Sequence, residues 1–217
     1  MRPISIRNRI LLLAGLAIVA ALWSTGAALR TYSDFNLQVS LLFQSANNDI
    51  LRTVLYWLAY INGDWRAAIV VIIICLLIWW RRGWYDAAFT SAAGILSELN
   101  EGLKAAFQLP RPSPELVQVM AVETGFAYPS GHSFFSIIFY GFLAYLALRN
   151  MKGAEKWALF TACIAMILAV GISRIFLGVH WFSDVIGGYL FGGFFLSALI
   201  LVYEVLESKY KEAAVNR

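Results

Sequence analysis

The sequence predicts an all-α integral membrane protein whose helices form a bundle, and three observations lead to this prediction. The hydrophobic fraction of the 217 residues is 60%, and the mean hydropathy is +0.69. Charged residues make up only 14% of the chain, whereas soluble domains carry about 25%. The apolar residues also gather into runs long enough to cross a bilayer. So large an apolar excess does not fit one soluble core, and we expect residues 1–217 to form a single membrane-embedded domain.

Six segments of the chain are apolar and long enough, or nearly so, to span the membrane as helices. A span needs about 20 mostly apolar residues. The segments cover residues 10–29, 64–80, 84–107, 132–149, 156–173 and 183–206. The second is the shortest, and the aromatic residues that follow it are typical of the membrane interface: Trp79, Trp80, Trp84 and Tyr85. Residues 38–60 mix apolar and polar positions and predict a further helix that lies on the membrane surface.

The first apolar segment has two interpretations. Arg2, Arg7 and Arg9 precede a run from Ile10 to Ala28, and the small residues at 24–27 resemble a signal-peptide cleavage region. The run is also long enough to span the membrane, so we expect an uncleaved first helix.

The positive charges fall unequally on the two sides of this predicted bundle. One side carries 11 of the 17 lysines and arginines: Arg2, Arg7, Arg9, Arg81, Arg82, Arg149, Lys152, Lys156, Lys209, Lys211 and Arg217. The other side carries Arg30, Arg52, Arg66, Lys104, Arg111 and Arg174. The positive-inside rule places the first set, and with it both termini, in the cytoplasm. We therefore expect a multi-pass protein of the inner (plasma) membrane.

The composition argues against three other kinds of site or partner. Cys75 and Cys163 lie in separate apolar runs, which predicts buried side chains and no disulfide. No stripe of lysines and arginines carries interleaved aromatic residues, so nucleic acid is not an expected partner. The two histidines, His132 and His180, have no neighbouring cysteine or carboxylate cluster, and we expect neither a metal nor a cofactor.

Polar residues near the ends of the third and fourth spans suit a multiply charged anion on the outward side. Lys104 lies in the last turns of the third span, and Arg111 stands between two prolines that stiffen the backbone. The turn Ser130-Gly131-His132 leads into the fourth span, where free backbone N–H groups at a helix start can bind an anion. Alternatively, Lys104 and Arg111 contact lipid head groups and Ser130 is an ordinary helix cap.

A third polar stretch precedes the sixth span and contains Arg174, His180 and Asp184. His180 and Asp184 are four residues apart, so one helical turn would bring them together. A carboxylate on one imidazole nitrogen leaves the other free to attack, and the guanidinium fork of Arg174 matches phosphate oxygens. The alternative is a surface histidine–aspartate pair near the membrane boundary.

Taken together, the three stretches resemble the three-part motif of the type 2 phosphatidic acid phosphatase superfamily, and the match holds at every defining position. The matching residues are Lys104, Arg111 and Pro112; Pro129, Ser130, Gly131 and His132; and Ser173, Arg174, His180 and Asp184. The size and the predicted topology are similar to those of its bacterial phosphatidylglycerophosphate phosphatase B-like members.

The resemblance implies a metal-independent lipid phosphatase and a role for each residue. His180 would be the nucleophile that forms a phosphohistidine, oriented by Asp184. His132 would protonate the leaving oxygen and then activate water. The residues that would bind the phosphate are Lys104, Arg111, Ser130, Gly131 and Arg174. The expected partners are membrane lipids and a lipid phosphate, which would react at the periplasmic or exterior face.

Several alternatives stay open at this stage. The chain could be a phosphotransferase that passes the phosphoryl or headgroup to another acceptor, or a lipid-binding or transport protein without turnover. Vanadium haloperoxidases share the motif, but they are soluble, which this apolar content excludes. Candidate substrates include phosphatidylglycerophosphate, undecaprenyl pyrophosphate, phosphatidic acid and lipid A phosphate. Glu98 and Glu101 share a helix face with Lys104, and we interpret Glu101 as the partner of that lysine.

Overall fold

The computed structural model describes residues 6–46 and 48–215, and it places them in helices joined by loops. The helices are α1 (Ile6–Ala28), α2 (Ser33–Ser45), α3 (Asp49–Ile61), α4 (Asp64–Arg82), α5 (Trp84–Ile95), the 3₁₀ turn η1 (Leu96–Glu98), α6 (Leu99–Phe107), α7 (Gly131–Asn150), α8 (Gly153–Phe176) and α9 (Phe182–Val215). The prediction of an all-α fold is confirmed for this part of the chain.

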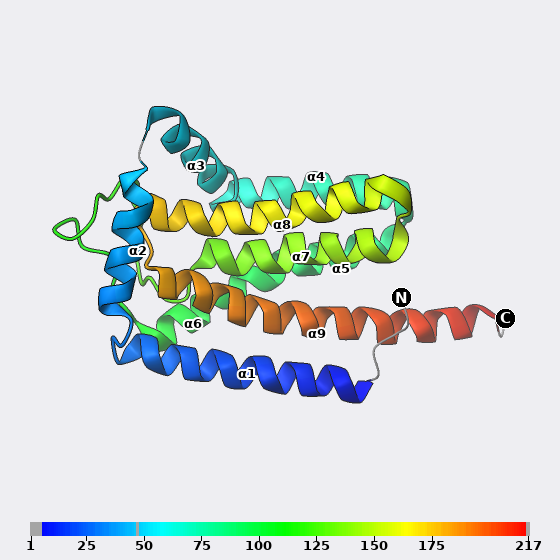
Figure 1. Ribbon diagram of the computed structural model, residues 1–217. Coiled ribbons are helices and arrows are strands. Elements are labelled where there is room, and N and C mark those ends of the chain that lie inside the picture. Colours follow the sequence, from blue (N-terminus) through cyan, green and yellow to red (C-terminus); the bar gives the residue numbers. More distant parts are fainter. Residues whose placement is uncertain (1–5, 47, 216–217) are drawn as a thin grey trace.

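The long helices lie lengthwise beside one another, and the polar loops gather at one end of the bundle (Figure 1). Helix α2 crosses that end, where α6 and the loop of residues 108–130 also lie. The start of α1 and the end of α9 lie at the opposite end. Backbone bonds hold the loop in place, since Met120 N donates to Leu177 O (2.9 Å) and Ala127 N to Leu109 O (2.9 Å).

Within residues 6–46 and 48–215, four helices are individually long and apolar enough to cross a membrane, namely α1, α7, α8 and α9. Helices α3 and α4 meet the same criterion only as a pair, bent by 72°. Helix α4 alone has 19 residues, but Asp64 and Arg66 stand at its start and Arg81 and Arg82 at its end. Length and composition therefore identify four spans, or five if the bent pair is one span.

Two of the predicted segments are broken in the structure. The single surface helix predicted over 38–60 is wrong: two helices, α2 and α3, cover this region. Asn48 caps α3 by accepting a bond from Leu51 N (2.9 Å), and such a cap starts a new helix. The segment predicted over 84–107 is interrupted at η1.

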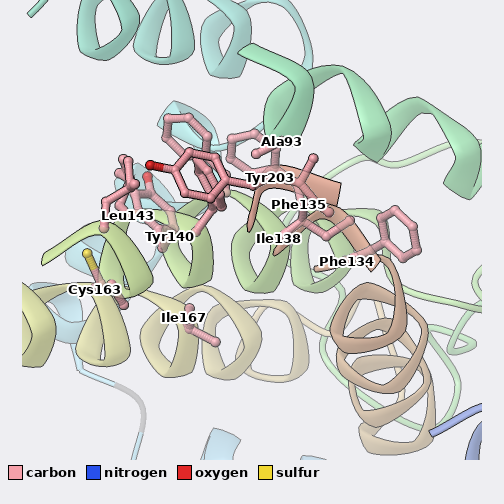
Figure 2. Close-up of a cluster of buried hydrophobic side chains, with 14 residues drawn as sticks. Ala93, Phe134, Phe135, Ile138, Tyr140, Leu143, Cys163, Ile167 and Tyr203 are labelled. Atoms are coloured by element: carbon pink, nitrogen blue, oxygen red, sulfur yellow. The ribbon is translucent and has the colours of Figure 1, made fainter. Parts of the chain in front are cut away.

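The core surrounds α7, the most buried of the four apolar helices. Its apolar side chains pack against α5, α8 and α9, and the fully enclosed residues of this core include Phe134 and Ile138 of α7 and Tyr203 of α9 (Figure 2). Lipid tails are as apolar as these side chains, so close packing and not water exclusion must favour this association. The fold therefore depends on how near α9 can come to α7.

Two glycines of α9 permit that close approach. A Cβ added at Gly188 would lie 2.6 Å from Ser130 O, and one added at Gly192 would lie 2.9 Å from Phe134 O. Both distances are too short for a side chain, and both neighbours are backbone atoms that cannot swing aside. The small residues therefore set the start of α7 directly against the first turns of α9.

Candidate active site

His180 lies in the short loop between α8 and α9, and its Nδ1 faces the carboxylate of Asp184. The two atoms Nδ1 and Oδ2 are 3.5 Å apart, and both side chains are buried. Asp184 Oδ2 also accepts a bond from Trp181 N (2.8 Å), as in a capping box at the start of a helix. The pair therefore forms across the N-terminus of α9, with His180 outside the helix, and the cap fixes the carboxylate.

Arg111 contacts the other nitrogen of the same imidazole ring. Its Nη1 lies 3.2 Å from His180 Nε2. A guanidinium has only donors, so Nε2 must accept and the ring proton of a neutral His180 belongs on Nδ1. Burial, followed by the charges of Arg174 and Arg111, lowers the pKa of His180 well below its usual value. The ring is therefore neutral near pH 7, with a lone pair on Nε2.

Arg111 is held rigidly by backbone carbonyls of the loops around it. It donates to Gly125 O (3.1 Å), Thr124 O (3.0 Å) and Val179 O (3.0 Å). Burial lowers the pKa of Arg111, which an arginine tolerates without losing its charge near neutral pH. Arg111 is therefore a fixed cation beside His180 Nε2.

Glu123 links Arg111 to a second, almost fully buried arginine. Its Oε1 pairs with Arg174 Nη2, and its Oε2 lies 3.6 Å from Arg111 Nη2. Arg174 is 2% exposed, and its Nε is buried with no hydrogen-bond partner in the described part of the chain. Sequence reasoning missed Glu123, which lies in an irregular loop outside the motif. Its carboxylate oxygens sit between the two cations, as two oxygens of a phosphate would.

His132 is positioned by the corner between α3 and α4. Its Nε2 lies 3.1 Å from Ala59 O, and because a carbonyl only accepts, Nε2 donates. Its Nδ1 is then the nitrogen left to exchange a proton. A Cβ added at Gly63 would lie 2.9 Å from Nε2, so the corner packs directly on the imidazole.

Lys104 lies beside the turn that begins α7. A Cβ added at Gly131 would lie 3.7 Å from its Nζ, and Nζ bonds Glu101 Oε1 at 2.8 Å, as predicted for that pair. Ser130 is fully buried: its N donates to Asp184 O (3.0 Å), and its Oγ accepts from Ser133 Oγ (3.2 Å). The bond to Asp184 O joins the second and third polar stretches.

The structure therefore brings the three stretches together at one end of the bundle. His132, Arg174 and Glu123 line a cavity of about 710 Å³. Across residues 6–46 and 48–215, no group of three or more histidine, cysteine or carboxylate side chains is arranged to hold a metal ion. What the residues can do is bind an oxyanion between arginines and present a neutral imidazole to it.

The fold and the site together define a helical membrane protein with a buried histidine–aspartate pair beside two arginines. Residues 83–207 match the family model of the PAP2 superfamily. The chain belongs to this superfamily, and the resemblance found in its motifs is confirmed.

Two curated relatives are similar over parts of their chains. The first is phosphatidylglycerophosphatase B of Bacillus subtilis strain 168, 32% identical over 114 residues, which are 52% of this chain and 55% of the relative. The second is an undecaprenyl-diphosphatase of Sulfolobus acidocaldarius, 38% identical over 79 residues, which are 36% of this chain and 34% of the relative. The aligned part thus spans about half, or less, of each relative.

Two solved structures share the fold. A transmembrane PAP2-type phosphatidylglycerolphosphate phosphatase from Bacillus subtilis superposes with a TM-score of 0.77 at 21% identity, over 91% of this chain and 96% of that one. LpxE of Aquifex aeolicus superposes with a TM-score of 0.62 at 21% identity, over 78% and 96% respectively. At such identities the likeness shows the fold alone.

Proposed function

We propose that this chain is a metal-independent phosphatase of membrane lipid phosphates or diphosphates that works through a phosphohistidine. The observation that carries the proposal is the set of contacts that the two ring nitrogens of His180 make. Its Nδ1 faces Asp184 at 3.5 Å, and its Nε2 lone pair is directed toward Arg111 at 3.2 Å. An imidazole fixed in this tautomer beside an anion-binding guanidinium is suited to attack phosphorus.

In the reaction, the substrate phosphate replaces the Glu123 carboxylate between Arg111 and Arg174. His180 Nε2 forms a bond to phosphorus as the bond between phosphorus and the lipid oxygen breaks, and His132 gives that oxygen a proton. Asp184 stabilises the imidazolium at Nδ1. His132 then takes a proton from water, which attacks the phosphohistidine and releases inorganic phosphate. Lys104, Ser130 and Gly131 complete the binding of the phosphate oxygens, and fixed cations neutralise the charge that develops.

We further propose six spans, with both termini in the cytoplasm and the site at the outer face of the plasma membrane. Helix α4 would be the second span and α5 to α6, with the break at η1, the third. The bias of positive charge supports this orientation. The position of the site, at the end of the bundle opposite to the start of α1, is consistent with it.

The names of the relatives support lipid phosphates as substrates. The decisive experiment is a phosphate-release assay of purified protein with phosphatidylglycerophosphate, undecaprenyl pyrophosphate, phosphatidic acid and lipid A phosphate. Rapid quench with radiolabelled substrate should leave acid-labile, base-stable label on the wild type and none on His180→Ala. Label that persists in this variant would overturn the assignment of the nucleophile.

Two other functions are separated by the same preparation. A phosphotransferase would phosphorylate an added acceptor alcohol, so the products are analysed for it alongside free phosphate. A binding or transport protein would retain lipid phosphate without releasing inorganic phosphate. The presence of a nucleophile, a proton donor and three cations in one site favours turnover.

A further inference from the structure

The cavity beside the catalytic residues has a second wall that the mechanism above does not use. It is lined by His132, Arg174 and Glu123, and also by Tyr60, Asp64 and Arg66 of the α3–α4 corner. This corner lies outside residues 83–207, the part that matches the superfamily. The second wall is therefore supplied by a part of the chain that the family match does not cover.

Arg66 is held in a fixed orientation on this wall. Its guanidinium carbon lies 3.7 Å from the centre of the Tyr60 ring, a stacking distance that fixes the plane of the group. Its Nη2 donates to Asp64 Oδ2 (2.8 Å), and its Nε is buried without a hydrogen-bond partner among the described residues. A cation that is oriented in advance and has an unused donor is suited to bind an anion.

The pair that Arg66 makes with Asp64 does not block this use. The Asp64 side chain is 75% exposed, against 23% for Arg66, and an ion pair with one well-solvated partner contributes little. An incoming anion can therefore displace the Asp64 carboxylate from Arg66. The displaced side chain then rotates toward the solvent. Asp64 therefore competes only weakly with an incoming anion for the Arg66 guanidinium.

The position of the corner relative to the reaction indicates which part of a substrate would reach Arg66. The corner packs on His132 through Ala59 O and Gly63. In the proposed function, on which this step rests, His132 protonates the oxygen that leaves. Whatever is bonded to that oxygen therefore extends toward His132 and the wall behind it.

We propose that Arg66 forms a second phosphate subsite, which binds an anionic phosphate carried by the leaving group. Substrates of this kind include lipid diphosphates, whose leaving group is a lipid monophosphate, and phosphatidylglycerophosphate, whose leaving group contains a phosphodiester. Phosphatidic acid has no such phosphate in its leaving group and cannot use the subsite. The corner thus selects substrates with two phosphates over those with one.

The test compares three substrates: farnesyl diphosphate, short-chain phosphatidylglycerophosphate and short-chain phosphatidic acid. The quantity measured is the ratio of kcat/KM for each two-phosphate substrate to kcat/KM for phosphatidic acid. Arg66→Gln should lower this ratio by about tenfold to a hundredfold, since a charge-assisted hydrogen bond is lost. Asp64→Asn should raise it by roughly twofold to fivefold because it removes a weak competitor. Asparagine also tolerates the left-handed backbone at this position (φ 48°).

Arg52→Gln is the matched control. Arg52 pairs with Asp49 in α3 and is not among the residues that line the cavity, so this variant loses the same charge without touching the subsite. It should leave the ratio unchanged. If Arg66→Gln lowers the ratio for farnesyl diphosphate alone, the subsite binds only a phosphate bonded directly to the one that is transferred. If Arg66→Gln lowers the ratio for both substrates, the subsite also binds the phosphodiester of phosphatidylglycerophosphate.

Two results would overturn the subsite while leaving the proposed function intact. One is that Arg66→Gln lowers kcat/KM for all three substrates by the same factor while its unfolding temperature stays near that of the wild type. The other is that Arg52→Gln changes the ratio as much as Arg66→Gln does. If the wild type releases phosphate from none of the three, the proposed function itself fails.

Discussion

Glu123 forms an ion pair with Arg174, and its second carboxylate oxygen lies 3.6 Å from Arg111. The carboxylate therefore bridges two guanidinium groups that the proposed mechanism assigns to the substrate. In that mechanism, a phosphate and this side chain would compete for the same donors. Glu123 would then compensate the buried charges of the resting site and also compete with the substrate.

Replacement of Glu123 by glutamine should strengthen phosphate binding and weaken the fold. The neutral amide competes less well for the arginines, and the Arg174 charge loses its partner. Glu123 is partly exposed, so the loss of stability should be smaller than for a fully buried pair, about 1–3 kcal/mol. Thermal unfolding in detergent, with and without inorganic phosphate, measures both effects. The phosphate-induced rise in unfolding temperature should be larger in the variant than in the wild type; an equal rise in both would argue against competition.

The His180 ring should stay neutral well below pH 6.5. The chain has only two histidines, so a sample labelled with ¹⁵N-histidine gives two sets of imidazole signals, and His132→Ala identifies those of His180. Because burial holds the folded pKa below the unfolded value of about 6.5, the unfolded chain binds the proton first. This group's share of the free energy of unfolding is therefore complete above that value and falls as the pH drops below it. Titration of His180 near its usual pKa would contradict the described environment.

Replacement of Arg174 by lysine should lower kcat/KM by roughly tenfold to a hundredfold, the effect of one charge-assisted bond. In the structure, Nη2 binds Glu123 and Nε has no partner within residues 6–46 and 48–215, so both can serve two oxygens of one phosphate. A lysine keeps the charge but cannot supply the second, fixed donor. Steady-state kinetics on one lipid phosphate measures the change, and an unchanged kcat/KM would place Arg174 outside the substrate site.

The sequence was sufficient to predict the apolar helices and the contact between His180 and Asp184, because both leave a local signal. Long apolar runs marked α1, α7, α8 and α9, and the spacing of His180 and Asp184 predicted their pairing. The pairing arises differently from the prediction, however. His180 lies before α9, and the carboxylate is held by the helix cap at Trp181 N.

The parts that could not be predicted depend on contacts between distant segments. The break at η1 precedes Asn100, which is buried and donates to Pro129 O (3.3 Å), a bond across 29 residues. The loop that carries Glu123 to Arg174 is tied to Leu177 through Met120 N. Neither contact leaves a periodic pattern in the sequence. Local sequence patterns therefore could not predict either of them.

Removal of divalent metal should leave the activity intact. In the proposed mechanism, Lys104, Arg111 and Arg174 supply the positive charge that Mg²⁺ provides in many phosphoryl-transfer enzymes. Activity is therefore expected to be the same with and without EDTA. Vanadate should inhibit, because its trigonal bipyramid resembles the phosphoryl group in transfer. Activity that EDTA abolishes and Mg²⁺ restores would contradict a mechanism that relies on side chains alone.

Removal of His132 and removal of His180 should affect the reaction rate differently as the leaving group of the substrate changes. A lipid alkoxide is a poor leaving group and needs a proton, whereas nitrophenolate departs without one. His132→Ala should therefore slow the reaction of phosphatidic acid by a much larger factor than the reaction of p-nitrophenyl phosphate. A lipid pyrophosphate should fall between them. His180→Ala should abolish the reaction of every substrate, since it removes the atom that bonds to phosphorus.

The comparison requires the single-turnover rate of phosphoenzyme formation, measured by rapid quench. In the proposed mechanism, His132 also activates water in the second step, and this would obscure the difference in steady-state rates. The bond from its Nε2 to Ala59 O leaves Nδ1 as the nitrogen that transfers the proton. Equal slowing of both substrates by His132→Ala would mean that His132 binds the phosphate and is not the acid.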